Sequence, residues 1–198
     1  MIAKKIMMTW LLLAGLLTLS GCGINNIPTL DEQVKANWAQ VENQYQRRAD
    51  LIPNLVSTVK GYAAHETETL QAVVEARAKV GSMQVDSSIL NNPEQLKQFE
   101  AAQSQLSSAL SRLMVVVERY PDLKANQNFL TLQSQLEGTE NRISVARRDF
   151  IQSVSAYNTE IRTFPGRIWH SLLYSEMPIR ETYEATTTGA EEAPKVEF

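Results

Sequence analysis

The stretch from residue 124 to residue 164 carries an aromatic or aliphatic side chain at one position in every seven, and no slip interrupts this repeat. The repeated positions are Phe129, Leu136, Ile143, Phe150, Tyr157 and Phe164. A seven-residue apolar repeat is typical of a long α-helix that packs lengthwise against other helices, because it keeps one stripe of side chains on one face. We therefore expect a helix from about Lys124 to Phe164, ended by Pro165 and Gly166.

A second pattern, with apolar residues spaced alternately three and four apart, runs from Val34 to Val80. It predicts another long helix, with Thr29 as its N-cap. Pro53 lies inside this pattern, where a proline removes one backbone hydrogen bond and clashes with the preceding turn. We expect a kink at Pro53, and this kink could divide the helix into two members of a bundle.

A third long helix is predicted from Pro93 to about Tyr120, after a connection over residues 81–92. Short connections make neighbouring helices antiparallel. The fold class is therefore all-α, an elongated antiparallel up-and-down bundle over residues 29–174, with a four-helix-bundle-like core. A short helix over residues 167–174 completes it. Residues 175–198 are polar and without periodicity, so we expect a flexible C-terminal tail.

The start of the chain has the features of a secretory leader. Lys4 and Lys5 precede an apolar run over residues 6–19, which is shorter than the roughly 20 residues that span a bilayer. The following Leu19-Ser20-Gly21-Cys22 resembles the lipobox of bacterial lipoproteins. This resemblance implies a signal peptide at residues 1–21, a lipid-bearing (diacylglyceryl, often palmitate-containing) Cys22 and an anchored linker at residues 22–28. The alternatives are an ordinary signal peptide with a spare cysteine, or an uncleaved membrane anchor.

A lipid anchor implies a protein outside the cytoplasm, facing the periplasm or the cell exterior. An aspartate after the cysteine retains such proteins at the inner membrane, but Gly23 occupies that position here. Sorting to the outer membrane is therefore allowed, and the sequence does not decide between the two membranes. Cys22 is the only cysteine, so no internal disulfide can form. The chain has net charge −3, and loss of residues 1–21 would remove two lysines and no acid. This mildly acidic balance argues against a nucleic-acid partner.

Five polar residues interrupt the apolar stripes of the predicted helices: Arg48, Glu66, Gln103, Glu140 and Arg147. A charge buried in a bundle is costly unless it is paired and hydrogen-bonded. We therefore expect these residues to form a buried polar network that sets the register of the helices. The alternative is a polar pocket that binds a ligand.

No pattern in the chain indicates catalysis, so we predict a protein that is not an enzyme, with no catalytic residues and no cofactor. His65 and His170 are the only histidines. The segment beginning at His65 lacks the second histidine of a zinc-protease helix, and neither histidine follows a glutamate at the spacing of carboxylate-bridged iron sites. We therefore expect no metal site and interpret this segment as a solvated helix face.

Several ordered segments of the chain resemble the LemA family. They are RRADLIPNLV at 47–56, KGYAAHE at 60–66, YPDLKAN at 120–126 and TENRI at 139–143, followed by Tyr157-Asn158 and Phe164-Pro165. The resemblance implies a bacterial, membrane-associated helical bundle and carries no settled biochemical activity. Phe150-Ile151, where the family tends to show Tyr-Asn, and the 167–174 segment depart from the family pattern.

These features together predict a lipid-anchored adaptor or scaffold in the cell envelope. The family resemblance implies a partner among envelope membrane proteins, such as those of the TPM-domain type. Trp169, on the short helix, is the candidate partner contact, since tryptophan is frequent in interface anchors. The alternative function is a ligand- or metal-binding envelope sensor that uses the polar residues inside the bundle. The oligomeric state is not predicted.

Overall fold

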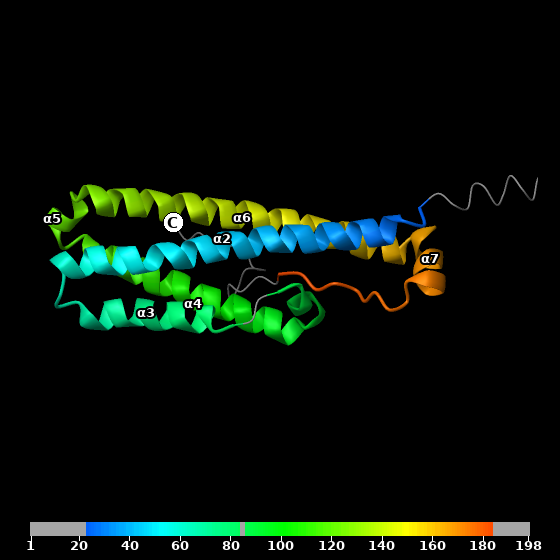
Figure 1. The fold of residues 1–198 in the computed structure, drawn as a ribbon, viewed down its shortest axis with the longest axis horizontal. Helices are drawn as coiled ribbons and strands as arrows, with labels where there is room; N and C mark the ends of the chain where they lie inside the picture. The colour runs from blue at the N-terminus through cyan, green and yellow to red at the C-terminus, as the bar shows by residue number, and fades with distance from the viewer. Residues whose placement is uncertain (1–22, 84–85, 184–198) are drawn as a thin grey trace, which may run out of the picture.

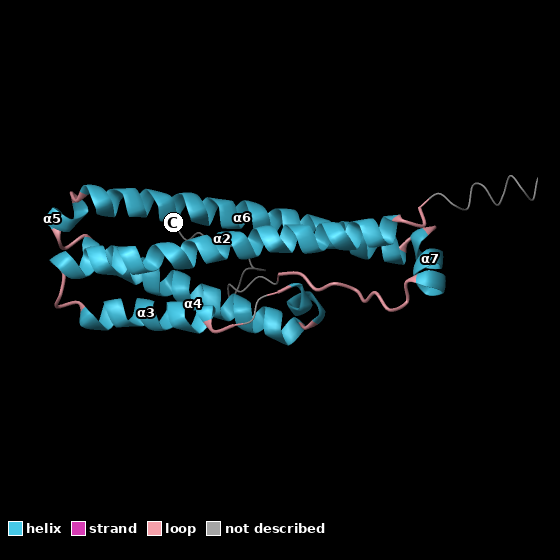
Figure 2. Ribbon diagram, viewed as in Figure 1, coloured by secondary structure: helices cyan, strands magenta, loops and turns pink. Residues whose placement is uncertain are grey.

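The structure is a computed structural model that describes residues 23–83 and 86–183. These residues form helices and no strands, as predicted (Figure 2). The elements in chain order are α2 (Asn26–Tyr62), α3 (Thr67–Gly81), the 3₁₀ helix η1 (Ser87–Asn91), α4 (Pro93–Val117), α5 (Pro121–Lys124), α6 (Gln127–Arg162) and α7 (Gly166–Leu173). The predicted signal peptide, Cys22 and residues 184–198 lie outside the described residues.

The two longest helices, α2 and α6, lie side by side along the bundle, and α3 packs on α4 (Figure 1). The helix α5 lies at one end of the molecule, and α7 lies at the other end, beside the start of α2. The core has two clusters. The distal half, nearest α5, is built around Ile52, Val73, Leu106 and Phe129. The proximal half, nearest α7, is built around Trp38, Phe99, Phe150 and Tyr157.

The predicted first helix is two helices, and the division does not fall at Pro53. α2 continues through Pro53 to Tyr62, and the chain reverses over residues 63–66 before α3 begins. The N–H of Ala63 donates to the carbonyl of Val59 at 2.8 Å and closes the last turn of α2. The three-and-four spacing continues through this reversal, so periodicity alone concealed the break.

Helix α2 tolerates Pro53 because another helix replaces the missing donor. In a regular helix the N–H of residue 53 would donate to the carbonyl of Ala49, but proline has no N–H. Here Arg77 of α3 donates from Nε to the oxygen of Ala49 at 2.9 Å. Pro53 itself is exposed, so its ring faces away from the core. The same contact therefore joins α3 to α2 and satisfies a carbonyl that would otherwise lack its partner.

The ends of the helices differ in how well the sequence predicts them. Asn92 and Asn126 cap α4 and α6 by accepting backbone N–H groups of the first turn, and Pro93 occupies the first turn of α4. The predicted N-cap, Thr29, is wrong by four residues, because the N-cap position of α2 is Asn25. α2 begins at Asn26, and the side chain of Ile27 is fully buried, so the linker after Cys22 is shorter than the predicted 22–28.

The first part of the predicted flexible tail, residues 175–183, packs on the proximal half, and we name it the C-terminal strap. Asn158 exchanges two hydrogen bonds with the backbone of Arg180, of 2.8 and 3.0 Å. The hydroxyl of Tyr157 donates to the carbonyl of Pro178 at 3.0 Å. The prediction of a flexible tail is therefore wrong for these residues. The side chains of Asn158 and Tyr157 hold the backbone of the strap, and such isolated polar contacts leave no periodic signal in the sequence.

The strap ends in contacts with the core. Arg180 is buried and forms an ion pair with buried Asp31 of α2, with an Nη2–Oδ1 distance of 2.6 Å. Tyr183 stacks beside Trp38 and Phe150, with ring centroids 6.3 and 5.6 Å away. α3 ends at Gly81 and does not extend along the proximal half. The strap and η1 pack there instead (Figure 1).

A central polar pocket

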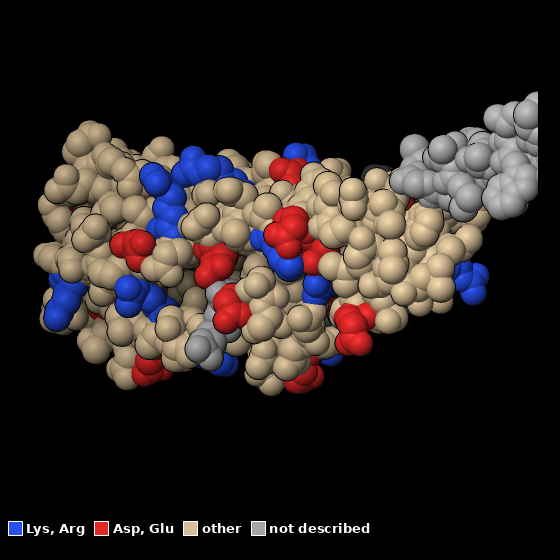
Figure 3. All heavy atoms as spheres, turned by 45° about the vertical axis from the view of Figure 1, so that its right-hand side comes forward, with Lys and Arg blue, Asp and Glu red and all other residues tan. Residues whose placement is uncertain are grey.

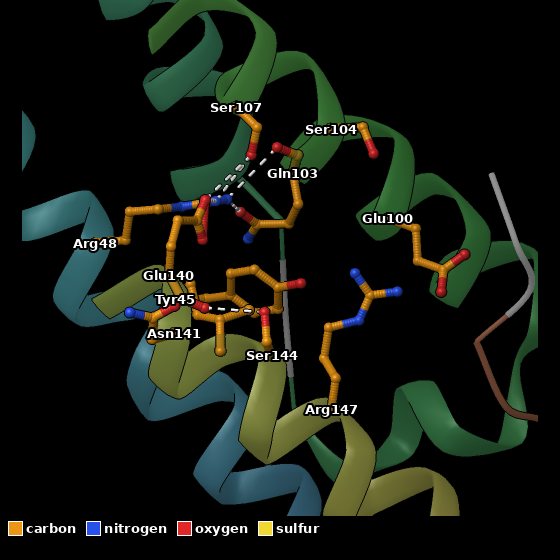
Figure 4. Close-up of a pocket in the computed structure, with 11 residues that line it drawn as sticks. Tyr45, Arg48, Glu100, Gln103, Ser104, Ser107, Glu140, Asn141, Ser144 and Arg147 are labelled. Atoms are coloured by element: carbon orange, nitrogen blue, oxygen red, sulfur yellow. Dashed lines mark hydrogen bonds and ion pairs between the residues drawn. The ribbon is translucent and has the colours of Figure 1, made fainter. Parts of the chain in front are cut away.

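A polar pocket lies near the junction of the two halves, and Arg48 of α2 lies on its wall (Figure 4). Arg48 is 2% exposed, which is exceptional for a guanidinium. It occupies an inward-facing position of α2, between Tyr45 and Ile52, where the apolar pattern would place an aliphatic side chain. Burial at this position requires that α4 and α6 supply its hydrogen-bond acceptors.

Two helices supply those acceptors. Nη1 of Arg48 donates to Ser107 Oγ at 2.9 Å and to Glu140 Oε1 at 2.6 Å. Nη2 donates to the side-chain and main-chain oxygens of Gln103. The guanidinium also lies 5.1 Å from the centre of the Tyr45 ring, a cation–π arrangement. One arginine thus ties α2 to both α4 and α6 in the middle of the bundle.

The pocket beside this cluster has a volume of about 380 Å³. Its charged lining is balanced, with two arginines and two glutamates, and hydroxyl and amide groups fill the rest of the wall. The lining residues are Tyr45, Arg48, Glu100, Gln103, Ser104, Ser107, Glu140, Asn141, Ile143, Ser144 and Arg147. Arg147 projects from α6 on the side opposite Arg48, toward Glu100 (Figure 4). The pocket is therefore polar and carries both charge signs.

The structure brings four of the five predicted network residues to this pocket and places the fifth elsewhere. Arg48, Gln103 and Glu140 are in direct contact, and Arg147 lines the far wall. Arg147 lies 4.1 Å from the ring centre of Tyr183 in the strap, so it links the pocket to the proximal half. The side chain of Glu140 is 47% exposed, so the Arg48–Glu140 pair lies at the pocket mouth rather than in the core.

The prediction that Glu66 shares this network is wrong. Glu66 lies in the reversal between α2 and α3, at the distal end, where it accepts hydrogen bonds from Arg119 Nη2 at 2.9 Å and the hydroxyl of Tyr120 at 3.0 Å. The hydrogen bond to Glu66 raises the pKa of Tyr120. Because the chain reverses over residues 63–66, Glu66 no longer follows the register that placed it on the inner face of α2.

Sequence reasoning missed several residues of the pocket wall. Ser107 follows Gln103 by one turn of α4, and Ser144 follows Glu140 by one turn of α6. Polar residues four positions apart lie on one helix face. These pairs could therefore have indicated a polar row on α4 that faces a polar row on α6, in addition to the apolar stripes.

Two donors on the pocket wall have no acceptor among the described residues: Nε of Arg48 and the amide nitrogen of Gln103. Gln103 is 4% exposed, so its amide nitrogen is largely shielded from solvent. Burial raises the pKa of the Tyr45 hydroxyl above its ordinary value. The wall thus offers hydrogen-bond donors to a small polar molecule.

The other predicted features are placed as follows. Trp169 is half-buried and packs on the proximal core, so the exposed large apolar side chains of α7 are its neighbours Ile168, Leu172 and Leu173. Across residues 23–83 and 86–183, no three His, Cys, Asp or Glu side chains are close enough to hold a metal ion. In the same ranges, no helix has the length and apolar character needed to cross a bilayer.

Comparisons with known proteins identify a matching family and several relatives. A family model described as the LemA family matches residues 37–198. The chain is 28% identical over 166 residues to magnetosome protein MamQ 2 of Paramagnetospirillum magneticum, covering 76% of this chain and 60% of that protein. It is 32% identical over 119 residues to protein LemA of Metamycoplasma hominis, covering 60% of this chain and 50% of that protein.

MamQ of Magnetospirillum gryphiswaldense is 27% identical over 157 residues, which cover 71% of this chain and 58% of that protein. The chain thus spans between 50% and 60% of the length of these curated relatives. The family match covers α3, α4, α5, α6, α7, the strap and all but the first 11 residues of α2. The chain belongs to the LemA family.

Proposed function

We propose that this LemA-family chain is a non-enzymatic adaptor of the bacterial cell envelope, anchored to a membrane by lipid on Cys22. The observation that carries the proposal is the Leu-Ser-Gly-Cys motif behind a short apolar leader, followed almost at once by the bundle. α2 begins at Asn26, so three residues separate it from Cys22. Three extended residues span at most about 11 Å, so an acylated Cys22 would hold the proximal end close to the membrane surface.

An adaptor role fits the surface of the bundle. The long helices α2 and α6 present polar outer faces, and charges of both signs are interspersed along the molecule (Figure 3). The matching family and the names of the relatives designate no reaction. The MamQ relatives are called magnetosome proteins. We expect a membrane protein, such as one of the TPM-domain type, as the partner.

Cross-linking in intact cells tests this proposal, with the full chain as bait and Cys22→Ala as the control. We expect the wild-type chain to capture the same envelope membrane protein in repeated experiments, and the control to lose it. A second control, Gln98→Ala at an exposed position of α4, should capture the partner as the wild type does. Capture that is equal with and without Cys22 would contradict an anchored adaptor.

A second candidate, an envelope sensor, is favoured by the unpartnered donors of the central pocket. The wall carries charges of both signs, which suit a polar or zwitterionic small molecule. A hydrogen-bond acceptor on that molecule would accept from the amide nitrogen of Gln103. A thermal-shift screen of amino acids and small carboxylates tests this function, because binding to the native state raises its melting temperature. A shift that Gln103→Leu abolishes, and Gln98→Leu leaves intact, would favour the sensor. Uniform absence of shifts would favour the adaptor.

A further inference from the structure

The helix α7 exposes a compact group of large apolar side chains. Ile168 and Leu172 are 46% and 69% exposed and lie one turn apart on the same face. Leu173 at the end of the helix is 56% exposed, and Phe164 just before it is 83% exposed. The opposite side of α7 packs inward, with Gly166 buried and Trp169 against the proximal core. Apolar groups gathered at one end of a molecule mark an interaction site.

The position of α7 limits what could cover this face. The described chain begins at Gly23, and a Cβ placed on Gly23 would lie 3.8 Å from Cγ of Pro165, the residue before α7. The apolar run over residues 6–19 and Cys22 precede Gly23 in the sequence. Membrane attachment through that segment would therefore place the start of α7 at the membrane surface, at the same end of the bundle (Figure 1).

The charges around α7 also fit a membrane surface. Arg162 and Arg167 are exposed on either side of Phe164 and Pro165. On the face shown in Figure 3, the end that carries α7 has few charges and a basic side chain at its tip. Two carboxylates also lie near α7: Glu160 beside Gly166, and exposed Glu176 just after the helix. Arginines beside an apolar helix face attract anionic headgroups while the apolar side chains enter the boundary of the acyl chains.

We infer that α7 lies in the membrane interface, with Phe164, Ile168, Leu172 and Leu173 inserted among the lipids and the two arginines at anionic headgroups. This inference rests on the proposed membrane anchoring and adds a second attachment to it. One acyl anchor would leave the bundle free to pivot about its linker. A second contact, made by α7, fixes the orientation of the long axis and hence the height at which the distal half meets a partner.

Fluorescence quenching tests the inference on the full acylated chain in vesicles of phosphatidylethanolamine and phosphatidylglycerol. A polarity-sensitive dye is placed on Leu172→Cys, and on Leu130→Cys as the matched control. Leu130 is also exposed, at 42%, but it lies in α6 near the distal end. Acylation blocks Cys22, so the introduced thiol is the one that reacts. Lipids carrying a nitroxide near the headgroup then report which dye lies in the interface.

We expect strong quenching and a blue shift for the dye at residue 172, and neither for the dye at residue 130. Absence of quenching at residue 172, or equal quenching at both positions, would overturn the inference. Transfer of the acylated chain between vesicles gives a second readout. Ile168→Glu with Leu172→Glu should speed transfer about tenfold or more, since burial of one aliphatic side chain shifts an equilibrium by about that factor. Leu130→Glu should leave the rate unchanged.

The failure of the anchor is distinguishable from the failure of this inference. Mass spectrometry of the vesicle-bound chain reports whether Cys22 is acylated, independently of the dye. An acylated chain without quenching at residue 172 would refute the contact of α7 and leave the proposed anchor intact. An unmodified Cys22 would refute the acyl anchor. The dye is then placed on Leu172→Cys in a Cys22→Ala background, and quenching there would leave the contact of α7 standing.

Discussion

The distal and proximal halves of the bundle share α2, α4 and α6 but are completed by different means. In the distal half, α3 supplies a fourth helix, and the core is almost entirely aliphatic. In the proximal half, η1 and the C-terminal strap take that place, and the core is aromatic, with Trp38, Phe99, Phe150 and Tyr157. The comparison teaches that a regular helix can be replaced by a segment without periodicity, provided that specific polar contacts hold it.

The two halves therefore depend on different interactions. The distal half relies on the burial of aliphatic side chains on four helices. The proximal half adds a buried ion pair, backbone hydrogen bonds to Asn158 and an edge-to-face contact between the rings of Phe150 and Tyr183, all of which require the strap. Substitutions can consequently release the strap selectively, or weaken both halves together.

The largest effect is expected for Trp38→Ala, which should lower the free energy of unfolding by about 4 kcal/mol. Trp38 is 1% exposed and packs on Phe99, Phe150 and Tyr183. Urea denaturation measures the loss. Leu106→Ala in the distal half is the matched control and should cost about 3 kcal/mol.

Trypsin distinguishes the two substitutions, because cleavage after Arg180 requires release of the strap. We compare the two variants at urea concentrations that give them the same free energy of unfolding. Under these conditions, we expect faster cleavage at Arg180 in Trp38→Ala than in Leu106→Ala. Equal rates would mean that the strap does not depend on the aromatic core, and the contrast between the halves would be lost.

The next effect is expected for Arg180→Ala, at about 3 kcal/mol, because it leaves Asp31 buried beside Lys35 alone. Thermal or urea unfolding measures this cost. The effect of Asp31→Ala should then be clearly smaller in the Arg180→Ala background than in the wild type, since the pair is already broken. Additive costs would show that the two residues do not interact. Arg148→Ala, an exposed arginine, should change stability by less than about 0.5 kcal/mol.

Arg77→Ala tests the joint between α2 and α3 in the distal half. It should cost about 1–2 kcal/mol, because the carbonyl of Ala49 loses its donor. In a Pro53→Ala background, residue 53 regains an N–H that can donate to Ala49, so the same substitution should cost much less. Unfolding of the four chains completes this double-mutant cycle. An equal cost in both backgrounds would show that the carbonyl of Ala49 does not need Arg77.

The smallest effect is expected from acid. Burial alone would raise the pKa of Asp31, but hydrogen bonds from Arg180 and Lys35 outweigh it and hold that pKa below its ordinary value of 3.8. The stability that this carboxylate contributes is therefore complete above about pH 4 and is lost as the pH falls through the lower, folded-state pKa. The midpoint of unfolding should fall less steeply with decreasing pH in Asp31→Asn than in the wild type. Identical slopes would contradict an ion pair in the folded state.

The regular parts of this fold follow from sequence, because apolar periodicity reports which face of a helix is buried. The repeat from Phe129 to Phe164 predicts α6, and its members are buried as far as Tyr157. The last member, Phe164, lies beyond the end of α6 at Arg162 and is 83% exposed. Arg48, Gln103 and Glu140 interrupt three separate stripes and still meet, since they lie at the same level along α2, α4 and α6. This part of the polar site could thus be anticipated from spacing alone.

The rest depends on contacts that periodicity does not encode. The reversal at residues 63–66 keeps the three-and-four spacing, so Glu66 was placed on the wrong face. Pro53 indicates that the carbonyl of Ala49 lacks its usual N–H donor in the helix, but only the fold shows that Arg77 donates to it instead. The strap is held by Arg180 and Tyr183, two isolated residues in a polar segment. A buried ion pair between residues 149 positions apart leaves no local pattern to read.

Attachment of the proximal end to a membrane is tested most directly by mass spectrometry of the chain purified from membranes. We predict that residues 1–21 are absent and that Cys22 is the first residue, with diacylglycerol on its sulfur. Cys22→Ala should retain residues 1–21 and carry no lipid. A wild-type chain that retains residues 1–21, or whose Cys22 is unmodified, would contradict the lipid-anchored bundle.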